Sequence, residues 1–502
     1  MKRFPVLLLA ALLSACTLAP QYHRPDLPVS DQWPADTQVP GETQSSQQAD
    51  GSGPGIAAVS SADRIGWREF FADPRLQRLI EIALENNRSL RIAVLNVAAS
   101  QAEYRVQRGS LFPTISATGA GDIDRLPANG AVPLGAIGGS NGTSPPAAGA
   151  SGSTFHYYSA GIGFTSYELD LFGRQRSLTT QAFEQYLAQD ETRRSTQISL
   201  VAEVATDYFA VLADQSLVKL TEETLRNETE SYELTKAMYD RDTTTLLSLK
   251  QAESAVDAAR ANLEQFQRQL ALDTHALTLV VGQEIPGDLP PERDLDTEDL
   301  LEEVPAGLPS DLIVQRPDIM SVEHSLRAAN ANIGAARAAF FPSIQLTGSG
   351  GTASNKLGNL FSKGSGTWSF MPTITVPLFA GGRNRANLDL AHVEKNIAVA
   401  QYELTIQTAF REVSDALSAR GSYVKQYEAQ QALVAADAEA YKLSELRFRS
   451  GVDNYLATLD AERSLYTAQQ QLVTTREAEL ANRVTLYKAL GGGWEDRLVS
   501  RR

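Results

Sequence analysis

The feature that most constrains this chain is an internal duplication. Three landmarks recur in the same order and at similar spacing. They are Phe112-Pro113-Thr114-Ile115 with Phe341-Pro342-Ser343-Ile344 (229 residues later), Leu171-Phe172 with Leu378-Phe379 (207 later), and Gly173-Arg174-Gln175-Arg176 with Gly382-Arg383-Asn384-Arg385 (209 later). Self-similarity at a fixed period indicates one structural unit written twice. The spacing falls by 22 residues after the first landmark, so the first copy carries about that many extra residues, and the Gly-, Pro- and Ala-rich segment 126–154 predicts a long loop there.

Long helices dominate each copy. No proline interrupts residues 173–242 or 382–451, and about 68 helical residues at 1.5 Å each would span on the order of 100 Å. A heptad pattern follows in the first copy at Leu249, Val256, Leu263, Leu270 and Leu277. The second copy repeats it at Leu465, Leu472 and Leu486, with Glu479 and Asn482 as interruptions. Sustained heptads predict coiled-coil packing of antiparallel helices.

Each copy also contains a pair of alternating segments that predict strands. Residues 114–123, 158–164, 344–346 and 367–378 place apolar side chains at every second position. A tilted strand of about ten residues crosses the hydrocarbon of a bilayer, although a soluble sandwich sheet fits the strand pattern equally well. The smallest known membrane barrels use eight strands, so four strands in a membrane would require several copies to pool them.

The N-terminus resembles a lipoprotein signal. Lys2 and Arg3 precede a short apolar run, and Leu13-Ser14-Ala15-Cys16 resembles the lipobox that directs cleavage and lipid attachment. Residues 1–15 are therefore expected to be a signal peptide, with a diacylglyceryl lipid on Cys16. Cys16 is the only cysteine, which excludes an intrachain disulfide. Thr17, where an aspartate would retain many bacterial lipoproteins in the inner membrane, favours the outer membrane.

Composition argues against several other classes of protein. The net charge of -15 does not favour nucleic acid as a partner. Gly138-Gly139-Ser140-Asn141-Gly142 fits a nucleophile-elbow pattern, but it lies in the predicted loop without the flanking strand and helix that the motif needs. The five histidines are scattered, and none has the spacing of a metal site. We therefore expect no enzyme activity, no metal and no cofactor beyond the lipid on Cys16.

Taken together, these motifs resemble the TolC-like outer-membrane factors, most closely their lipoprotein branch of OprM or NodT type. The match is carried by 307–312, Gln315-Arg316-Pro317-Asp318-Ile319, Ala328-Ala329-Asn330-Ala331, Phe340-Phe341-Pro342-Ser343-Ile344, Tyr22-His23-Arg24-Pro25 and 448–456. The resemblance covers nearly the whole mature chain. It implies a mixed α and β fold in which a homotrimer pools its strands into a twelve-stranded transmembrane barrel that continues as a periplasmic α-helical barrel.

The resemblance also implies a function and partners. The family docks on a periplasmic adaptor protein and an inner-membrane pump, which favours a passive efflux channel in the outer membrane for small molecules such as antibiotics, served by a proton-driven transporter of RND type. Two alternatives remain open, namely the duct of a type I protein secretion system and a periplasmic coiled-coil scaffold lipoprotein.

The expected organisation follows the duplication. The segments are a signal peptide (1–15), a lipidated N-terminal segment (16–64), helices (65–112), strands with the long loop (113–172), a helical hairpin (173–290), a linker with helices (291–341), strands (342–379), a second hairpin (380–493) and a tail (494–502).

Two sets of site residues are predicted in the hairpins. The repeat alignment sets Arg241-Asp242-Thr243-Thr244 opposite Ser450-Gly451-Val452-Asp453, between antiparallel helices, and we expect both turns to contact the adaptor. Gly451 suits a turn that needs an unusual backbone angle. By resemblance, Leu456 and Asp460 would narrow the pore, with Leu247 as the counterpart of Leu456, although Gln251 replaces the acid in the first copy. A solvated Asp460 beside Arg463 is the alternative.

Overall fold

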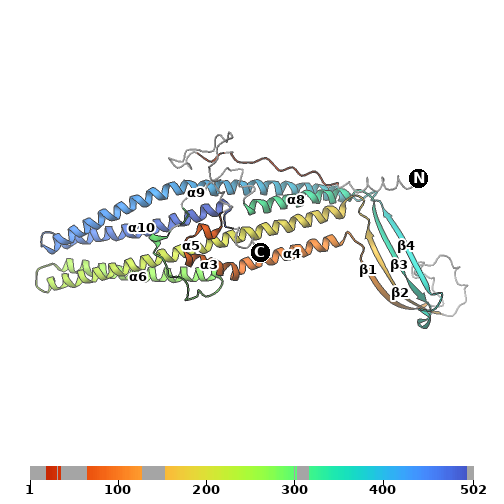
Figure 1. Cartoon of the computed structure of the whole chain (residues 1–502), viewed down its shortest axis with the longest axis horizontal. Coiled ribbons are helices and arrows are strands. Elements are labelled where there is room, and N and C mark those ends of the chain that lie inside the picture. The colour runs from red at the N-terminus through yellow and green to blue at the C-terminus, as the bar shows by residue number, and fades with distance from the viewer. Residues whose placement is uncertain are drawn as a thin grey trace, which may run out of the picture. The chain divides into compact units, whose positions relative to one another are not determined.

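The computed structural model describes residues 18–30, 32–34, 65–126, 153–298, 300–301 and 316–493. The chain divides into two compact units (Figure 1), and each is described by itself. The sheet unit comprises Met1–His23, Gln101–Glu184 and Arg327–Asn396. The helical unit comprises Arg24–Ser100, Gln185–Leu326 and Ile397–Arg502.

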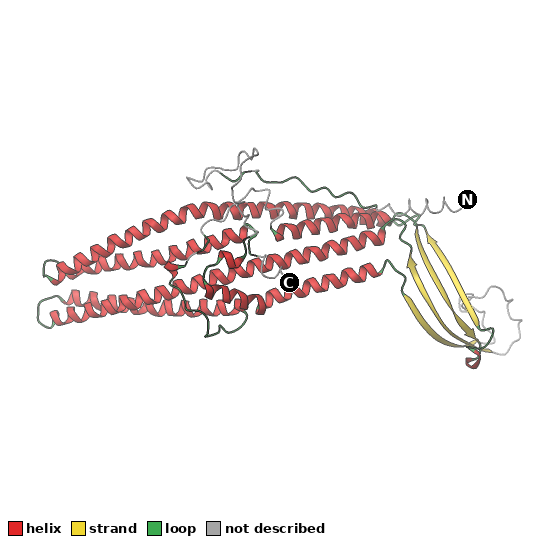
Figure 2. Ribbon diagram, viewed as in Figure 1, coloured by secondary structure: helices red, strands yellow, loops and turns green. Residues whose placement is uncertain are grey.

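The sheet unit is built on four antiparallel strands in the order β1-β2-β3-β4 (Figure 2). Their bounds are β1 (Ile115–Leu126), β2 (Ser153–Glu168), β3 (Ser343–Ser354) and β4 (Gly366–Thr375). The pairing sets Ala117 opposite Ile162 and Ile344 opposite Ile374, so apolar positions share one face. The outer edges of β1 and β4 have no strand beside them in this sheet.

The strand limits differ from the alternating segments, because β1, β2 and β3 continue past residues 123, 164 and 346. Pairing of β1 with β2 continues to Leu126 opposite Ser153, so the strands extend into the segment expected to be a loop, and residues 127–152 of that loop lie outside the described residues. In contrast, β4 ends at Thr375 although the alternation continued to Leu378. The last pair is Ser343 with Thr375, and Pro377 beyond it has no N–H to donate to a ladder.

Each strand is adjacent along the chain to one of four long helices. Part of each of these helices belongs to the sheet unit. They are α4 (Arg88–Gly109), α5 (Arg174–Tyr239), α8 (Pro317–Ala338) and α9 (Arg383–Arg449). Tyr104 of α4 contacts Phe183 of α5 at a ring separation of 5.3 Å, and Asn332 of α8 donates to Glu394 of α9 at 3.3 Å. A Cβ atom at Gly334 of α8 would lie 2.5 Å from Ser177 Oγ of α5, so only glycine permits this approach. The helices therefore follow the order of the strands.

The helical unit contains the remaining parts of these helices, the long helices α6 and α10, and short elements around its core. The further elements are α2 (Trp67–Phe70), α3 (Pro74–Asn86), α6 (Leu246–Val281), η3 (Leu295–Thr297) and α10 (Tyr455–Ala489), while η5 (Leu357–Asn359) belongs to the sheet unit. Phe70 stacks on Tyr487 at 4.0 Å, and both are buried. The buried Tyr208 hydroxyl donates to Asp73 at 2.7 Å. Asp73 also caps α3, because its side chain accepts from the Arg75 N–H.

The two residues that interrupt the second heptad pattern have partners. Glu479 is buried and accepts from Arg476 at 2.8 Å and from Arg483 at 2.6 Å. Asn482 donates to the carbonyl of Ala416 in α9 at 3.0 Å. Buried polar groups are tolerated when their hydrogen bonds are made, so α10 continues through both positions.

The N-terminal segment that follows Cys16 lies along the helices of both units. In the sheet unit, Arg337 donates to the carbonyl of Leu18 at 3.2 Å, and Asn330 donates to that of Pro20 at 2.8 Å. In the helical unit, Arg24 forms a two-bond ion pair with Glu323 at 2.8 and 3.1 Å. Bidentate pairs of this kind hold two segments in a fixed geometry.

No helix in the described part of the chain is long and apolar enough to cross a membrane.

Candidate functional site

The sheet presents an exposed apolar face. Trp368 is 81% exposed, and five further large apolar side chains on the same face are exposed as well: Ile115, Ile123, Ile162, Phe370 and Ile374. The opposite face carries mostly small and polar side chains, among which Ser349 and Ser369 share a hydrogen bond of 2.8 Å, together with the exposed Phe155, Tyr157 and Met371. An apolar face of this size is a surface for contact with another molecule or with lipid.

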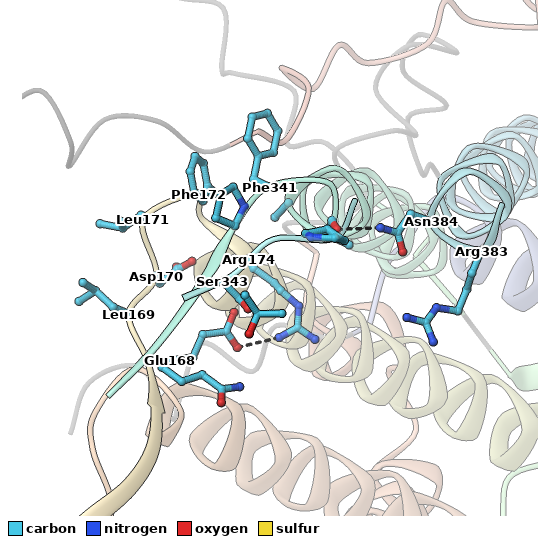
Figure 3. A pocket seen from close by; sticks show the side chains of 16 residues that line it. Glu168, Leu169, Asp170, Leu171, Phe172, Arg174, Phe341, Ser343, Arg383 and Asn384 are labelled. Carbon is cyan, nitrogen blue, oxygen red and sulfur yellow. Dashed lines mark hydrogen bonds and ion pairs between the residues drawn. The ribbon is translucent and has the colours of Figure 1, made fainter. Parts of the chain in front are cut away.

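A pocket of about 310 Å³ lies where the strands of the sheet unit lead into the helices (Figure 3). Glu168, at the end of β2, pairs with Arg174 of α5 at 3.0 Å. Asp170 accepts from the N–H of Arg176 at 2.9 Å and so caps the first turn of α5. Phe172 stacks on Phe341 with 4.8 Å between ring centroids, which joins the end of the first copy's strands to the start of the second copy's strands. These contacts fix the direction of the chain between strand and helix.

The two predicted adaptor-contact segments form turns of the same construction. Asp242 and Gly451 have positive φ angles of 56° and 72°. The N–H of the next residue, Thr243 or Val452, donates at 2.9 Å to a carbonyl five residues earlier. This pair of features is the Schellman motif that ends a helix. Gly451 thus has the left-handed backbone that the sequence predicted.

Each return helix then begins with a side-chain cap at an equivalent position. Thr245 accepts from the N–H of Ser248 before α6, and Asn454 accepts from that of Ala457 before α10. The second turn has an added ion pair, because Asp453 binds Arg447 at 2.5 and 3.0 Å. Both turns lie at the same end of the helical unit (Figure 1).

Four long helices meet just behind these turns. Ala252 and Ala255 of α6 pack against Tyr455 and Leu459 of α10, and Tyr232 of α5 and Phe448 of α9 complete the cluster. The two small alanine side chains allow the helices to approach closely.

Two buried carboxyl groups lie beside this cluster. The Tyr455 hydroxyl donates to Glu228 of α5 at 3.4 Å. Burial, together with the negative charges of Glu228 and Glu445, raises the pKa of the Glu462 carboxyl to about 8. Burial also raises the pKa of Glu228, while Tyr455 and Arg463 oppose the increase. The bond from Tyr455 to Glu228 joins α10 to α5. A neutral Glu462 favours this packing, because a charged Glu462 would be buried and repelled by Glu228.

Sequence reasoning missed Glu228 and Glu462, because an acid in a heptad helix normally lies in water. No sequence signal distinguishes them: Glu253, which the repeat aligns with Glu462, is half-buried and binds Lys250 at 2.5 Å.

The predicted gate residues lie on the other side of α10. Leu456 is 43% exposed and Asp460 is exposed, whereas their neighbours Tyr455 and Leu459 are buried. Leu247 is exposed at the start of α6. Asp460 is exposed three residues before Arg463 on α10, so the alternative of a solvated Asp460 stays open beside the gate. Cys16 and Gly138–Gly142 lie outside the described residues.

Comparison with known proteins shows which family the chain belongs to. The model of the outer membrane efflux protein family matches residues 79–283 and again residues 308–492. The antibiotic efflux pump outer membrane protein ArpC and the toluene efflux pump outer membrane protein TtgC, both of Pseudomonas putida, are each 49% identical over 492 residues, 97% of this chain and 95% of theirs. The open-state outer-membrane channel MtrE of Neisseria gonorrhoeae superimposes with a TM-score of 0.81 at 38% identity, covering 96% of this chain and 99% of that one. The chain therefore belongs to the outer membrane efflux protein family and is an outer-membrane component of an efflux pump.

Proposed function

We propose that the chain is the passive exit duct of a tripartite efflux system and that its cargo consists of small molecules. The observation that carries this proposal is a sheet with one exposed apolar face and an opposite face of mostly small and polar side chains, joined to long helices. An apolar face suits lipid, and a polar face suits a water-filled lumen. Relatives at 49% identity are named for antibiotic and toluene efflux, which supports small, largely apolar cargo.

The duct requires more than one copy. In lipid, the open edges of β1 and β4 would leave backbone groups without hydrogen bonds, and four strands are too few to close a barrel. We propose a homotrimer with a twelve-stranded barrel and a helical barrel in the periplasm, as the family resemblance implies. A lipid on Cys16 would anchor each copy, and no other cofactor is proposed.

The helix turns would contact the partner protein, and the exposed face of α10 would form the pore gate. Arg241–Thr244 and Ser450–Asp453 would contact a periplasmic adaptor, which in turn joins an inner-membrane transporter. In a trimer, Leu456 would form an apolar ring and Asp460 a ring of three carboxylates. Such rings resist wetting, repel anions and attract cations, and so would close the resting pore.

The function is tested by deleting the gene from the cell that encodes it. Efflux of ethidium should slow, tolerance of toluene and antibiotics should fall, and a plasmid copy of the gene should restore both. Normal dye efflux accompanied by retention of a secreted protein would instead identify a protein secretion duct. Recovery of the chain as a monomer in the periplasmic fraction would identify a scaffold lipoprotein.

A further inference from the structure

We propose that the sheet unit carries a binding site for an anionic phospholipid between the end of α8, the start of α9 and the N-terminal segment. Arg337 and Arg385 would bind the phosphate, and apolar side chains beside them would contact the acyl chains. This inference rests on the proposed duct only because the duct places the sheet in a membrane. The site lies within one copy of the chain, so it can be tested whatever the number of copies in the duct.

The site is a pocket of about 600 Å³ within the sheet unit. Its apolar lining includes Leu18, Phe340 and Leu388. Its polar lining includes Arg337, Arg385 and His392. A phospholipid combines apolar acyl chains with a charged phosphate, and basic pockets between helices bind such headgroups. The lining therefore offers a partner for each part of a phospholipid.

Arg385 lacks the carboxylate partner that its counterpart in the first copy has. The repeat aligns Arg385 with Arg176, which binds the side chain of Asp170 at 3.2 Å and donates to the Asp170 backbone carbonyl at 3.2 Å. The counterpart of Asp170 is Pro377, which has no carboxylate. Asp389, which also lines the pocket, pairs with Arg385 at 3.7 Å, and these side chains are 64% and 81% exposed. An exposed pair of this length is weak, so Arg385 keeps N–H groups for another anion.

Arg337 also has hydrogen-bond donors for a phosphate. Its side chain donates to the carbonyl of Leu18 at 3.2 Å, which positions the guanidinium against the N-terminal segment. A guanidinium has five N–H groups, so this bond leaves donors for a second acceptor. Arginine binds phosphate through two parallel hydrogen bonds, and such bonds are stronger at a half-buried position such as this one than in water.

His392 stands where the first copy has an aromatic contact. The repeat aligns His392 with Phe183, whose ring lies 5.3 Å from the ring of Tyr104. His392 is half-buried, and its ring can donate a hydrogen bond, which a phenyl ring cannot do. The polar pocket therefore belongs to the second copy, beside the N-terminal segment, whereas the first copy fills the equivalent place with an aromatic ring.

The N-terminal segment indicates which molecule occupies the pocket. Leu18 lines the pocket and follows Cys16 by two residues, so the proposed lipid anchor would begin within about 7 Å of Leu18. The pocket would then lie at the depth of the lipid headgroups. The glyceryl esters of the anchor carry no charge, whereas two guanidinium groups favour an anion. A separate phospholipid supplies that anion at this depth.

Native mass spectrometry of the full chain, purified in detergent and titrated with phosphatidylglycerol, tests the site. The spectra give both the number of bound lipids and the number of chains. Arg385→Gln should raise the dissociation constant of the first lipid about tenfold, because it removes a charged hydrogen-bond donor. Asp389→Asn should lower it, because Arg385 loses its carboxylate neighbour. Arg383→Gln is the matched control and should have no effect, since Arg383 is exposed two residues away and lines the pocket of Figure 3 instead.

Exchange of residues between the two copies gives a test that keeps both arginines. His392→Phe introduces the residue of the first copy and should raise the dissociation constant about fivefold, because one neutral hydrogen bond is lost. Phe183→His makes the reverse change and should create no second site, because Asp170 still binds Arg176 there. A second bound lipid in Phe183→His, with no effect of His392→Phe, would place the binding outside this pocket.

Three further results would count against the site. Equal weakening by Arg383→Gln and Arg385→Gln would mean that phosphatidylglycerol responds to surface charge alone. Displacement of phosphatidylglycerol by an equal concentration of inorganic phosphate would mean a site for a small anion. Binding that appears only in Cys16→Ser would mean that the chain's own lipid fills the pocket. In contrast, a monomeric chain that binds phosphatidylglycerol with the expected order of variants would overturn the proposed duct and support the lipid site.

Discussion

Leu456 and Asp460 lie one helical turn apart on the exposed side of α10, and their neighbours Tyr455 and Leu459 anchor the other side in the helix cluster. We expect Leu456→Ala with Asp460→Ala to raise single-channel conductance in planar bilayers and to weaken cation selectivity, because the variant loses both an apolar ring and a carboxylate ring. Asp460→Asn separates charge from size and should change selectivity more than conductance. Unchanged conductance and selectivity in the double variant would move the gate elsewhere.

Glu462 makes the helix cluster sensitive to pH. The pKa of its carboxyl is raised to about 8 from an ordinary value of 4.5, so the folded protein binds this proton more tightly than the unfolded chain does. The stabilisation is fully present below about pH 4.5 and is lost as the pH rises through 8, at up to about 1.4 kcal/mol per pH unit. The free energy of local opening around Tyr232 and Leu459, obtained from hydrogen exchange after division by the intrinsic exchange rate at each pH, should therefore fall between pH 6 and pH 8.

Glu462→Gln imitates the neutral acid and should flatten this pH dependence. Glu253→Gln is the control, because Glu253 is the repeat counterpart of Glu462 but lies half-buried beside Lys250. An unchanged pH profile in Glu462→Gln would assign the dependence to another group, of which Glu228 is the nearest candidate.

At the scale of elements, the two helix turns share one backbone conformation. The residue with left-handed φ is Asp242 in the first turn and Gly451 in the second. Gly451 adopts a φ of 72° without strain, whereas an alanine there would cost about 1 kcal/mol. Gly451→Ala should therefore speed hydrogen exchange in the last turn of α9 and the first turn of α10. Gly358→Ala is the control, since Gly358 has open space for a Cβ and no positive φ. Equal effects of the two substitutions would argue against a backbone constraint at Gly451.

The same turns should meet the adaptor. Val452 is exposed at the second turn and Arg241 at the first, so cysteines at these positions should crosslink to a co-expressed adaptor protein. Ala261→Cys, an exposed position midway along α6, provides the comparison. Preferential crosslinking from Ala261→Cys would refute contact at the turns.

At the scale of the whole molecule, the described N-terminal segment begins two residues after Cys16 and is held by hydrogen bonds from Arg337 and Asn330. We expect Cys16→Ser to abolish palmitate labelling and to reduce the yield in the outer membrane. Both units should remain folded, because the hydrogen bonds from Arg337 and Asn330 to the N-terminal segment do not involve the lipid. Equal palmitate labelling of Cys16→Ser and the natural chain would exclude Cys16 as the attachment site.

The sequence by itself determined the local structure. The absence of proline allowed α5 and α9 to extend over 66 and 67 residues, and period-2 alternation indicated the strands, because both patterns depend on near neighbours in the chain. Positive φ at Gly451 was expected because a glycine stands there in a turn between two helices, and Asp242 adopts the same backbone without glycine in the other turn. The tertiary structure decided which side chains are buried and which are exposed. Glu228 and Glu253 look alike in sequence, yet helix packing buries the first and leaves the side chain of the second 43% exposed beside Lys250. The Phe172–Phe341 stack likewise required the strand order, because it joins residues 169 positions apart that only the pairing of β2 with β3 brings together.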